Sequence, residues 1–208
     1  MLLWAALVLA VSGALVLALR LDVRAAEFFR AGLSRRGRHY VRMFTDLAKG
    51  AHWLVITVVV YAAAQIWLTT QNETPEMQRI GDLSFALLIA MVAASAILHS
   101  IKLLLGRRRP RDHFEHGLRG VRWFAFDTQY DSFPSGHSVT IFCVATIATA
   151  AWPAFAALWF AVAAVLALTR AVLTSHYLSD VLIGAALGLV MARETLAIGF
   201  PQLMPSWF

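Results

Sequence analysis

Basic residues near the middle of the chain are spaced so that they could bind an anion together. The segment from Lys102 to Pro110 reads KLLLGRRRP, and Lys102 and Arg109 are seven residues, or two helical turns, apart. Both side chains can therefore point the same way, while Pro110 discourages the helix from continuing. The segment can bind an anionic group, or it can be a basic anchor that follows a membrane span.

The segment from Ser132 to His137, SFPSGH, is typical of a helix start that binds anions. Pro134 suits a first helical turn, where free N–H groups and the positive end of the helix dipole attract negative charge. Gly136 lets a ligand approach the backbone, and His137 can give or take a proton near neutral pH. The alternative is a capped helix with a histidine at the membrane interface.

A third polar cluster runs from Thr169 to Asp180 and contains Arg170 and His176. His176 and Asp180 are four residues apart, so the carboxylate can reach the imidazole if the helix already includes His176. An aspartate that holds one ring nitrogen fixes the tautomer and makes the other nitrogen a better base or nucleophile. A buried structural pair is the alternative here.

The composition places these clusters in a membrane protein. Of the 208 residues, 60% are hydrophobic and 14% are charged, and the mean hydropathy is +0.67. These values exclude a disordered chain and argue against a soluble fold. The single cysteine, Cys143, excludes an internal disulfide. The net charge of +6 fits anionic lipid or phosphate better than nucleic acid, because the basic residues lie between long uncharged stretches.

Uncharged runs long enough to cross a bilayer predict six membrane spans. The run Ser132–Thr169 is too long for one crossing, and Trp152-Pro153 near its middle divides it in two. A signal peptide is the alternative for the first run, which lacks a charged start and a clear cleavage site. The other runs are Met1–Leu19, Gly50–Asn72, Leu83–Ile101 and Leu178–Gly199.

Residues 33–48, between the first two spans, alternate basic and apolar side chains at helical spacing. This pattern predicts an interfacial amphipathic helix, with a solvated basic linker as the alternative. We therefore expect an all-α fold in one domain over residues 1–208, a six-helix transmembrane bundle with this extra helix. Counting the crossings places all three polar clusters on the same membrane face.

On one face, the three clusters combine into an anion pocket with an acid and a nucleophile, as phosphoryl transfer requires. Lys102, Arg109 and Arg170 supply three positive charges. Each cation about 4 Å from a phosphate oxygen contributes on the order of 4 kcal/mol before desolvation, at an effective dielectric constant of about 20. Three such cations balance a phosphate dianion.

These motifs resemble those of the type 2 phosphatidic acid phosphatase family of membrane lipid phosphatases. The family's K-x6-R-P corresponds to Lys102–Pro110 and its P-S-G-H to Pro134–His137. Its S-R-x5-H-x3-D corresponds to Thr169–Asp180, where Thr169 replaces serine but keeps a hydroxyl. The resemblance covers about 80 residues directly, and the six-span layout agrees with the family elsewhere.

The resemblance implies the role of each site residue. His176 would attack phosphorus and form a phosphohistidine while Asp180 holds its ring, and His137 would protonate the departing oxygen. The phosphate would be bound by Lys102, Arg109, Ser135, Gly136 and Arg170. Water would then hydrolyse the intermediate, and no metal or other cofactor is expected. The substrate would be a lipid phosphate or lipid diphosphate in the bilayer, with no nucleic-acid partner.

Other interpretations share some of these features. Vanadium-dependent haloperoxidases resemble the family in the same motifs, but they are soluble. A protein that binds or transports a lipid phosphate without turnover needs the same basic pocket, whereas a purely structural membrane protein leaves the intramembrane charges without a purpose. His113 and His116, with Glu115 between them, lack a complete metal-ligand set. The 111–131 loop could form a lid or contact a head group.

Two arguments disagree about which side of the membrane carries the site. All but two of the 18 lysines and arginines, Arg79 and Arg193, lie on the site side by the crossing count. The positive-inside rule places that side in the cytoplasm. The resemblance implies a multi-pass protein of the inner membrane with its site on the outer, periplasmic or extracellular face. We expect the outer face.

Overall fold

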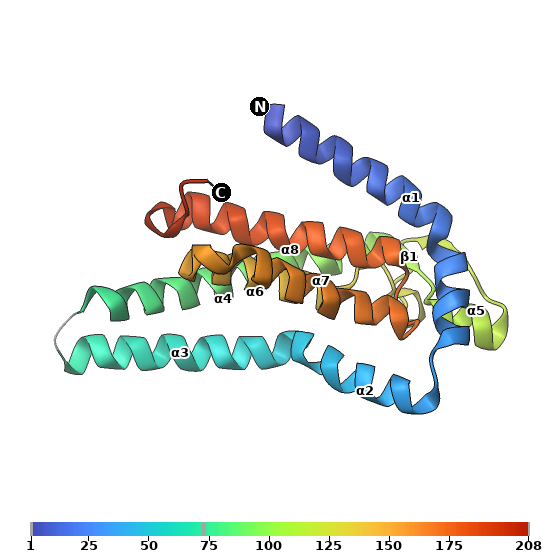
Figure 1. Ribbon diagram of the computed structural model, residues 1–208, viewed down its shortest axis with the longest axis horizontal. Coiled ribbons are helices and arrows are strands. Elements are labelled where there is room, and N and C mark those ends of the chain that lie inside the picture. Colours follow the sequence, from blue (N-terminus) through green and yellow to red (C-terminus); the bar gives the residue numbers. More distant parts are fainter. Residues whose placement is uncertain (1, 72–73, 208) are drawn as a thin grey trace.

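The long apolar runs form long helices in the computed structural model, which describes residues 2–71 and 74–207 (Figure 1). The expected spans are helices α1 (Leu2–Gly32), α3 (Gly50–Thr70), α4 (Pro75–Leu104), α6 (Gly136–Ala151), α7 (Ala156–Val172) and α8 (Leu178–Gly199). The break at Trp152-Pro153 is confirmed, because Pro153 begins a short 3-10 helix, η3 (Pro153–Phe155). Met1 and Asn72, at the edges of two predicted spans, lie outside the described residues.

Four described segments are long and apolar enough to cross a membrane: Arg35–Thr70, Pro75–Leu104, Pro153–Val172 and Leu178–Gly199. Helix α6 is equally apolar but shorter. Helix α4 begins earlier than the expected Leu83, because Thr74 caps it by accepting a hydrogen bond from the Met77 N–H and Pro75 fits its first turn. The chain is a multi-pass membrane protein with a predominantly helical fold.

The predicted helix between the first two spans is present as α2 (Arg35–Thr45), followed by a 3-10 turn, η1 (Asp46–Ala48). Ser34 caps α2 by accepting a hydrogen bond from the Gly37 N–H at 3.1 Å. Thr45 and Ala48 are buried, whereas Tyr40, Met43, Phe44 and Leu47 are exposed. This exposed apolar face, interspersed with arginines, is typical of a helix that lies at a membrane surface.

Helix α6 packs most closely against α8, and two glycines of α8 make this possible. A Cβ atom added at Gly184 would lie 2.5 Å from the Ser135 carbonyl oxygen, and one at Gly188 would lie 2.2 Å from that of Val139. Any other residue would force the two backbones apart. Because Ser135 immediately precedes α6, this contact fixes the start of α6 against α8.

A small segment with two paired strands (residues 105–123), which the all-α expectation did not include, follows α4. Strand β1 (Leu105–Arg107) pairs antiparallel with β2 (Val121–Trp123), and the connection holds helix α5 (Pro110–His116). Pro110 begins α5 and does not end α4, which already stops at Leu104. Strand β1 therefore lies between Lys102 and Arg109, and the expectation that they are two helical turns apart on one helix is wrong. The short helices η2 (Thr128–Tyr130) and η4 (Pro201–Leu203) complete the described elements.

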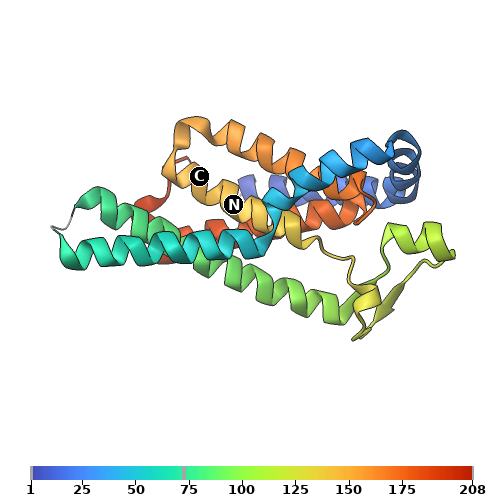
Figure 2. The same ribbon diagram turned by 90° about the horizontal axis from the view of Figure 1, so that it is seen from below.

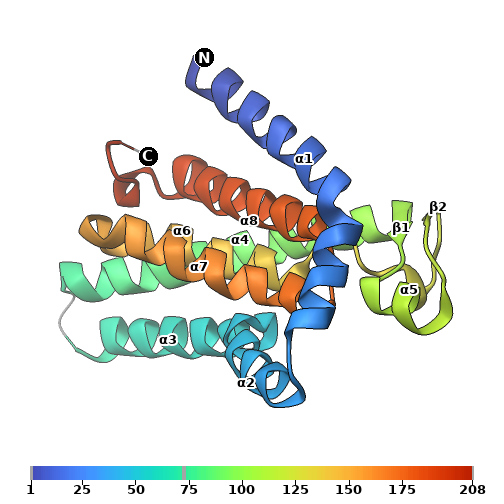
Figure 3. The same ribbon diagram turned by 45° about the vertical axis from the view of Figure 1, so that its right-hand side comes forward.

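The expectation that the three polar clusters lie at one end of the bundle is confirmed. The ends of α4 and α7 and the starts of α6 and α8 lie at the same end of the bundle, on the right in Figure 1. Figure 2 shows the yellow-green segment with α5 and the two strands extending beyond the helices at that end. In Figure 3 the C-terminal half of α1 crosses beside the start of α8, so a residue of α1 can reach the site.

Candidate active site

His176 lies in the short connection between α7 and α8, where it is 3% exposed. Its Nδ1 atom is 2.7 Å from the Ser132 carbonyl oxygen. A carbonyl only accepts hydrogen bonds, so Nδ1 carries the proton and Nε2 keeps its lone pair in the neutral ring. The backbone N–H of His176 donates to the Arg170 carbonyl at 3.2 Å, which folds the connection back on the end of α7.

Asp180 does not hold the imidazole directly, in contrast to our expectation. Its Oδ2 atom is 3.9 Å from Nδ1 of His176, and it accepts hydrogen bonds from the Ser132 hydroxyl at 2.6 Å and the Tyr177 N–H at 2.8 Å. The physical reason is that α8 begins at Leu178, so His176 precedes the helix and the four-residue spacing does not bring the two side chains within hydrogen-bond distance. Asp180 instead positions Ser132, whose carbonyl holds the ring.

A buried ionic network that sequence reasoning missed supports Asp180. Arg107 donates to Asp180 Oδ1 at 2.7 Å and to Asp22 Oδ2 at 2.8 Å. Asp22, in α1, also accepts from the hydroxyl of Ser179 at 2.6 Å and from its N–H at 3.0 Å. Burial lowers the pKa of Arg107, but the carboxylates of Asp180 and Asp22 outweigh this effect and raise it, so the guanidinium stays charged.

The two basic residues of the first cluster converge on Asp131. Arg109 donates from Nε and Nη2 to the two carboxylate oxygens of Asp131 at 2.7 and 2.6 Å. Lys102 donates from Nζ to the Asp131 carbonyl oxygen at 2.6 Å. Asp131 therefore orients both cations and offsets part of their positive charge.

Arg170, from the third cluster, has an unsatisfied buried donor. Among the described residues its Nε has no hydrogen-bond partner. Leaving a buried charged donor unpaired is costly, so this atom is suited to receive an anionic ligand. The neighbouring Thr169 hydroxyl bonds to the Leu166 carbonyl and lies 2.7 Å from the Thr45 hydroxyl, which joins α7 to α2.

The residues of the second cluster have two different roles: some hold the start of α6 in place, and others line a cavity. Ser135 is fully buried, its N–H donates to the Asp180 carbonyl at 3.0 Å, and its hydroxyl accepts from Ser138. Gly136 and His137, at the start of α6, line a cavity of about 300 Å³ together with Lys102. The positions predicted to bind phosphate therefore include one, Ser135, whose backbone N–H holds the start of α6 against α8.

The positive charges of Arg170 and Arg109 act on the imidazoles of both His137 and His176. Residues from all three clusters therefore belong to one charged site. Burial lowers the pKa of the His176 imidazole well below its usual value, and the positive charges of Arg170 and Arg109 lower it further. His176 is therefore neutral near pH 7, with the unprotonated Nε2 that a nucleophile needs.

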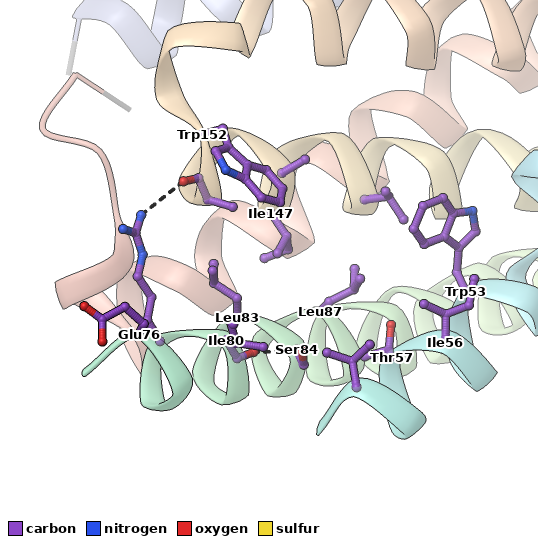
Figure 4. A pocket seen from close by; sticks show the side chains of 15 residues that line it. Trp53, Ile56, Thr57, Glu76, Ile80, Leu83, Ser84, Leu87, Ile147 and Trp152 are labelled. Atoms are coloured by element: carbon purple, nitrogen blue, oxygen red, sulfur yellow. Dashed lines mark hydrogen bonds between the residues drawn. The ribbon is translucent and has the colours of Figure 1, made fainter. Parts of the chain in front are cut away.

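A second cavity, of about 410 Å³, lies further along the same three helices, α3, α4 and α6. Met91 of the first cavity and Leu87 of the second are one turn apart on α4, as are Thr140 and Val144 on α6. Figure 4 shows the second cavity with Trp53, Leu83, Leu87, Ile147 and Trp152 around an apolar groove. The groove therefore lies on the same three helices as the first cavity, one helical turn away from it.

The β1–β2 segment and the loop after it present exposed aromatic side chains at the site end of the bundle. Trp123 is 69% exposed, and Phe124 and Phe126 stack with their ring centroids 6.4 Å apart. His113 of α5 bonds to the Arg119 guanidinium. The exposed rings suit a contact with lipid at the membrane surface.

Comparison with known proteins agrees with this architecture. Two curated relatives, from Rhizobium johnstonii and Rhizobium etli, are named lipid A 1-phosphatase; they are 28% identical over 156 residues and 27% identical over 150. The matches cover 73% and 70% of this chain but 63% and 64% of the relatives, so the chain spans just under two thirds of their length.

Two crystal structures share the fold. The match to Aquifex aeolicus LpxE has a TM-score of 0.55 at 18% identity and covers 85% of this chain and 95% of the other. The match to a transmembrane PAP2-type phosphatidylglycerolphosphate phosphatase from Bacillus subtilis has a TM-score of 0.61 at 18% identity and covers 96% and 98%. The family model described as PAP2 superfamily matches residues 83–203, which contain all three polar clusters, and the chain therefore belongs to the PAP2 superfamily.

Proposed function

We propose that this protein hydrolyses the terminal phosphate of a membrane lipid through a phosphohistidine at His176. The observation that carries the proposal is the bond from Nδ1 of His176 to the Ser132 carbonyl at 2.7 Å, which leaves Nε2 unprotonated in a strongly cationic site. An imidazole held in this way is an oriented, neutral nucleophile. The names of the two relatives support a lipid phosphate as the substrate class.

In the proposed first step, Nε2 of His176 attacks phosphorus, and the bond from phosphorus to the lipid oxygen breaks. His137, protonated when the phosphate dianion is bound beside it, gives its proton to that oxygen, so the lipid leaves as an alcohol. Water then attacks the phosphohistidine, with neutral His137 taking its proton, and inorganic phosphate departs. The two half-reactions return both histidines to their starting states.

The positive charges of the site would stabilise the transferring phosphoryl group. Lys102, Arg109 and Arg170 would bind its equatorial oxygens, and the free Nε of Arg170 is the donor best suited to do so. The backbone N–H of Gly136 would add a neutral donor at the start of α6, while Ser135 would hold that helix start against α8. These cations supply the charge that a metal ion would otherwise provide, so the proposed reaction needs no added metal.

Phosphate release by the purified protein in detergent tests this function. We expect His176→Ala to abolish release while the protein still folds and extracts normally, because the variant lacks the attacking atom. Turnover of this variant at the wild-type rate would overturn the assignment. A strict requirement for added magnesium would contradict the metal-independent scheme.

The groove along α3, α4 and α6 would hold an acyl chain of the substrate, because it is apolar and lies one helical turn from the cavity beside His137. Four lipid classes present a suitable terminal group: phosphatidic acid, phosphatidylglycerol phosphate, isoprenyl diphosphate and a glycolipid sugar phosphate. We propose the glycolipid sugar phosphate, on the names of the two relatives. Comparing phosphate release from all four substrates tests this choice.

The second function that fits the pocket is binding or transport of a lipid phosphate without turnover. The unprotonated Nε2 of His176 favours catalysis, since a binding site for a dianion gains more from a protonated imidazole. We also propose that the site lies on the outer face of the inner membrane. Labelling of Arg122→Cys, in a Cys143→Ala background, by a membrane-impermeant maleimide in intact cells is expected for that orientation; protection until the cells are opened would contradict it.

A further inference from the structure

A third histidine, His99, lies beside the proposed reaction centre and has no part in the mechanism above. It is on α4, three residues before Lys102, and it lines the same cavity as Lys102 and His137. A polar, ionisable residue within a membrane-spanning helix is costly and usually marks a substrate path. Within residues 2–71 and 74–207, the hydrogen bonds of its ring go only to Ser95.

These bonds fix the orientation of the His99 ring. Its Nδ1 atom is 2.7 Å from the Ser95 carbonyl oxygen and 3.3 Å from the Ser95 hydroxyl. The carbonyl can only accept, so Nδ1 is the donor and Nε2 is a free acceptor in the neutral imidazole. Nε2 of His99 is therefore an oriented hydrogen-bond acceptor at the edge of the cavity. The charged side chain that shares this cavity, Lys102, is instead a donor.

The position of the cavity indicates which part of a substrate would meet this acceptor. Its described lining includes His137, the proposed proton donor to the leaving oxygen, but not His176. The alcohol part of the lipid would therefore lie there, while the phosphoryl group lies toward His176. Leu54, Met91 and Leu98 also line the cavity, and the apolar groove lies further along the same helices. His99 thus lies where the polar part of the alcohol meets its acyl chain.

We propose that Nε2 of His99 accepts a hydrogen bond from a hydroxyl of the alcohol part of the substrate, and that the protein thereby prefers lipid phosphates that carry a hydroxyl near the phosphate ester. The inference rests on the proposed lipid phosphatase function and adds a substrate class to it. His99 is a binding residue in this account and takes no part in the chemical step.

A matched pair of lipids tests the proposal: 1-palmitoyl-glycerol 3-phosphate and its 2-deoxy analogue, which differ by one hydroxyl. The wild-type protein is expected to show a kcat/KM about fivefold higher for the first lipid, in line with one neutral hydrogen bond. In His99→Ala the preference disappears because the value for the hydroxylated lipid falls, while the value for the deoxy lipid stays the same. Ser100→Ala, a control on the same helix whose hydroxyl bonds to the Ala96 carbonyl, keeps the preference.

A binding measurement separates this inference from the proposed function. In a His176→Ala background, which cannot form the phosphohistidine, the hydroxylated lipid is expected to bind about fivefold more tightly, and adding His99→Ala removes the difference. Preferential binding without phosphate release by the wild type would contradict the proposed function and support the hydroxyl site. Equal affinities for the two lipids would overturn the inference. An equal loss of affinity for both lipids in His99→Ala would also overturn it, since His99 would then contact the phosphate or only shape the cavity.

Discussion

The Asp22 carboxylate in the first helix accepts a 2.8 Å hydrogen bond from Arg107, 85 residues further along the chain. The same guanidinium donates to Asp180, and the other contacts of Asp22 go to Ser179 at the start of α8. The first helix, the ribbon after α4 and the start of the last helix are thus joined by one buried network. This network positions Asp180, which in turn holds Ser132 in place beside the nucleophile.

Asp22→Ala should destabilise the protein, because it leaves the Ser179 N–H and part of the Arg107 charge buried without a partner. We expect a loss of about 3 kcal/mol, the usual cost of breaking a buried ion pair. Thermal unfolding in detergent measures it. Glu27→Ala, at an exposed position of the same helix, is the matched control and should leave the Tm unchanged. Equal Tm values for the two variants would contradict the network's role.

Ser132→Ala should lower kcat about tenfold, roughly 1.4 kcal/mol of transition-state stabilisation, with little change in KM. The variant keeps the carbonyl that holds His176 but loses the hydroxyl that fixes the carbonyl through Asp180. Asp180→Asn acts on the same contact, so the double variant should lose less than the sum of the two single losses. Strictly additive effects in the double-mutant cycle would show that Asp180 does not act through Ser132.

Asp131→Asn should tighten the binding of vanadate, a phosphate mimic. In the present arrangement the Asp131 carboxylate engages Arg109 through two hydrogen bonds and lies next to Lys102. Removing its negative charge makes the pocket more positive, and we expect the inhibition constant to fall about fivefold, roughly 1 kcal/mol. Weaker inhibition would mean that Asp131 is needed chiefly to aim Arg109.

The stability of the protein should fall on acidification below about pH 6.5, the ordinary pKa of histidine. In the folded protein, burial and the nearby cations hold the pKa of His176 well below that value, so the unfolded chain takes up a proton that the folded one does not. The contribution of neutral His176 to the free energy of unfolding is fully present above about pH 6.5. It is lost as the pH falls toward the pKa of His176 in the folded protein. The Tm of His176→Gln should therefore decline less than that of the wild type between pH 7.5 and 5; equal declines would contradict a neutral imidazole.

The sequence predicted the elements that depend on local patterns. The uncharged runs predicted the helices, the Trp152-Pro153 break separated α6 from α7, and the crossing count placed the three clusters at one end. The residue types at Lys102, Arg109 and His137 also identified positions that line or charge the site, although Lys102 and Arg109 do not share a helix.

Contacts between segments that are far apart in the sequence could not be predicted from such local patterns. Arg107 is one of three consecutive arginines, and only the ribbon formed by β1 shows that it faces Asp22 and Asp180. Ser132 holds His176 through a backbone carbonyl, an atom every residue has, so its type gave no signal. The expected contact between Asp180 and the ring depended on where α8 begins, and helix starts are hard to place to within one turn.

The most direct test of the central claim is to trap the covalent intermediate. The wild-type protein is mixed with a lipid phosphate labelled with ³²P at the terminal phosphate, quenched in alkali within milliseconds, and mapped by proteolysis and mass spectrometry. We predict an alkali-stable, acid-labile label on the peptide that contains His176, absent in His176→Ala and still formed but slow to decay in His137→Ala when the substrate has a good leaving group. Wild-type turnover with no labelled protein, or a label on a different residue, would contradict the account.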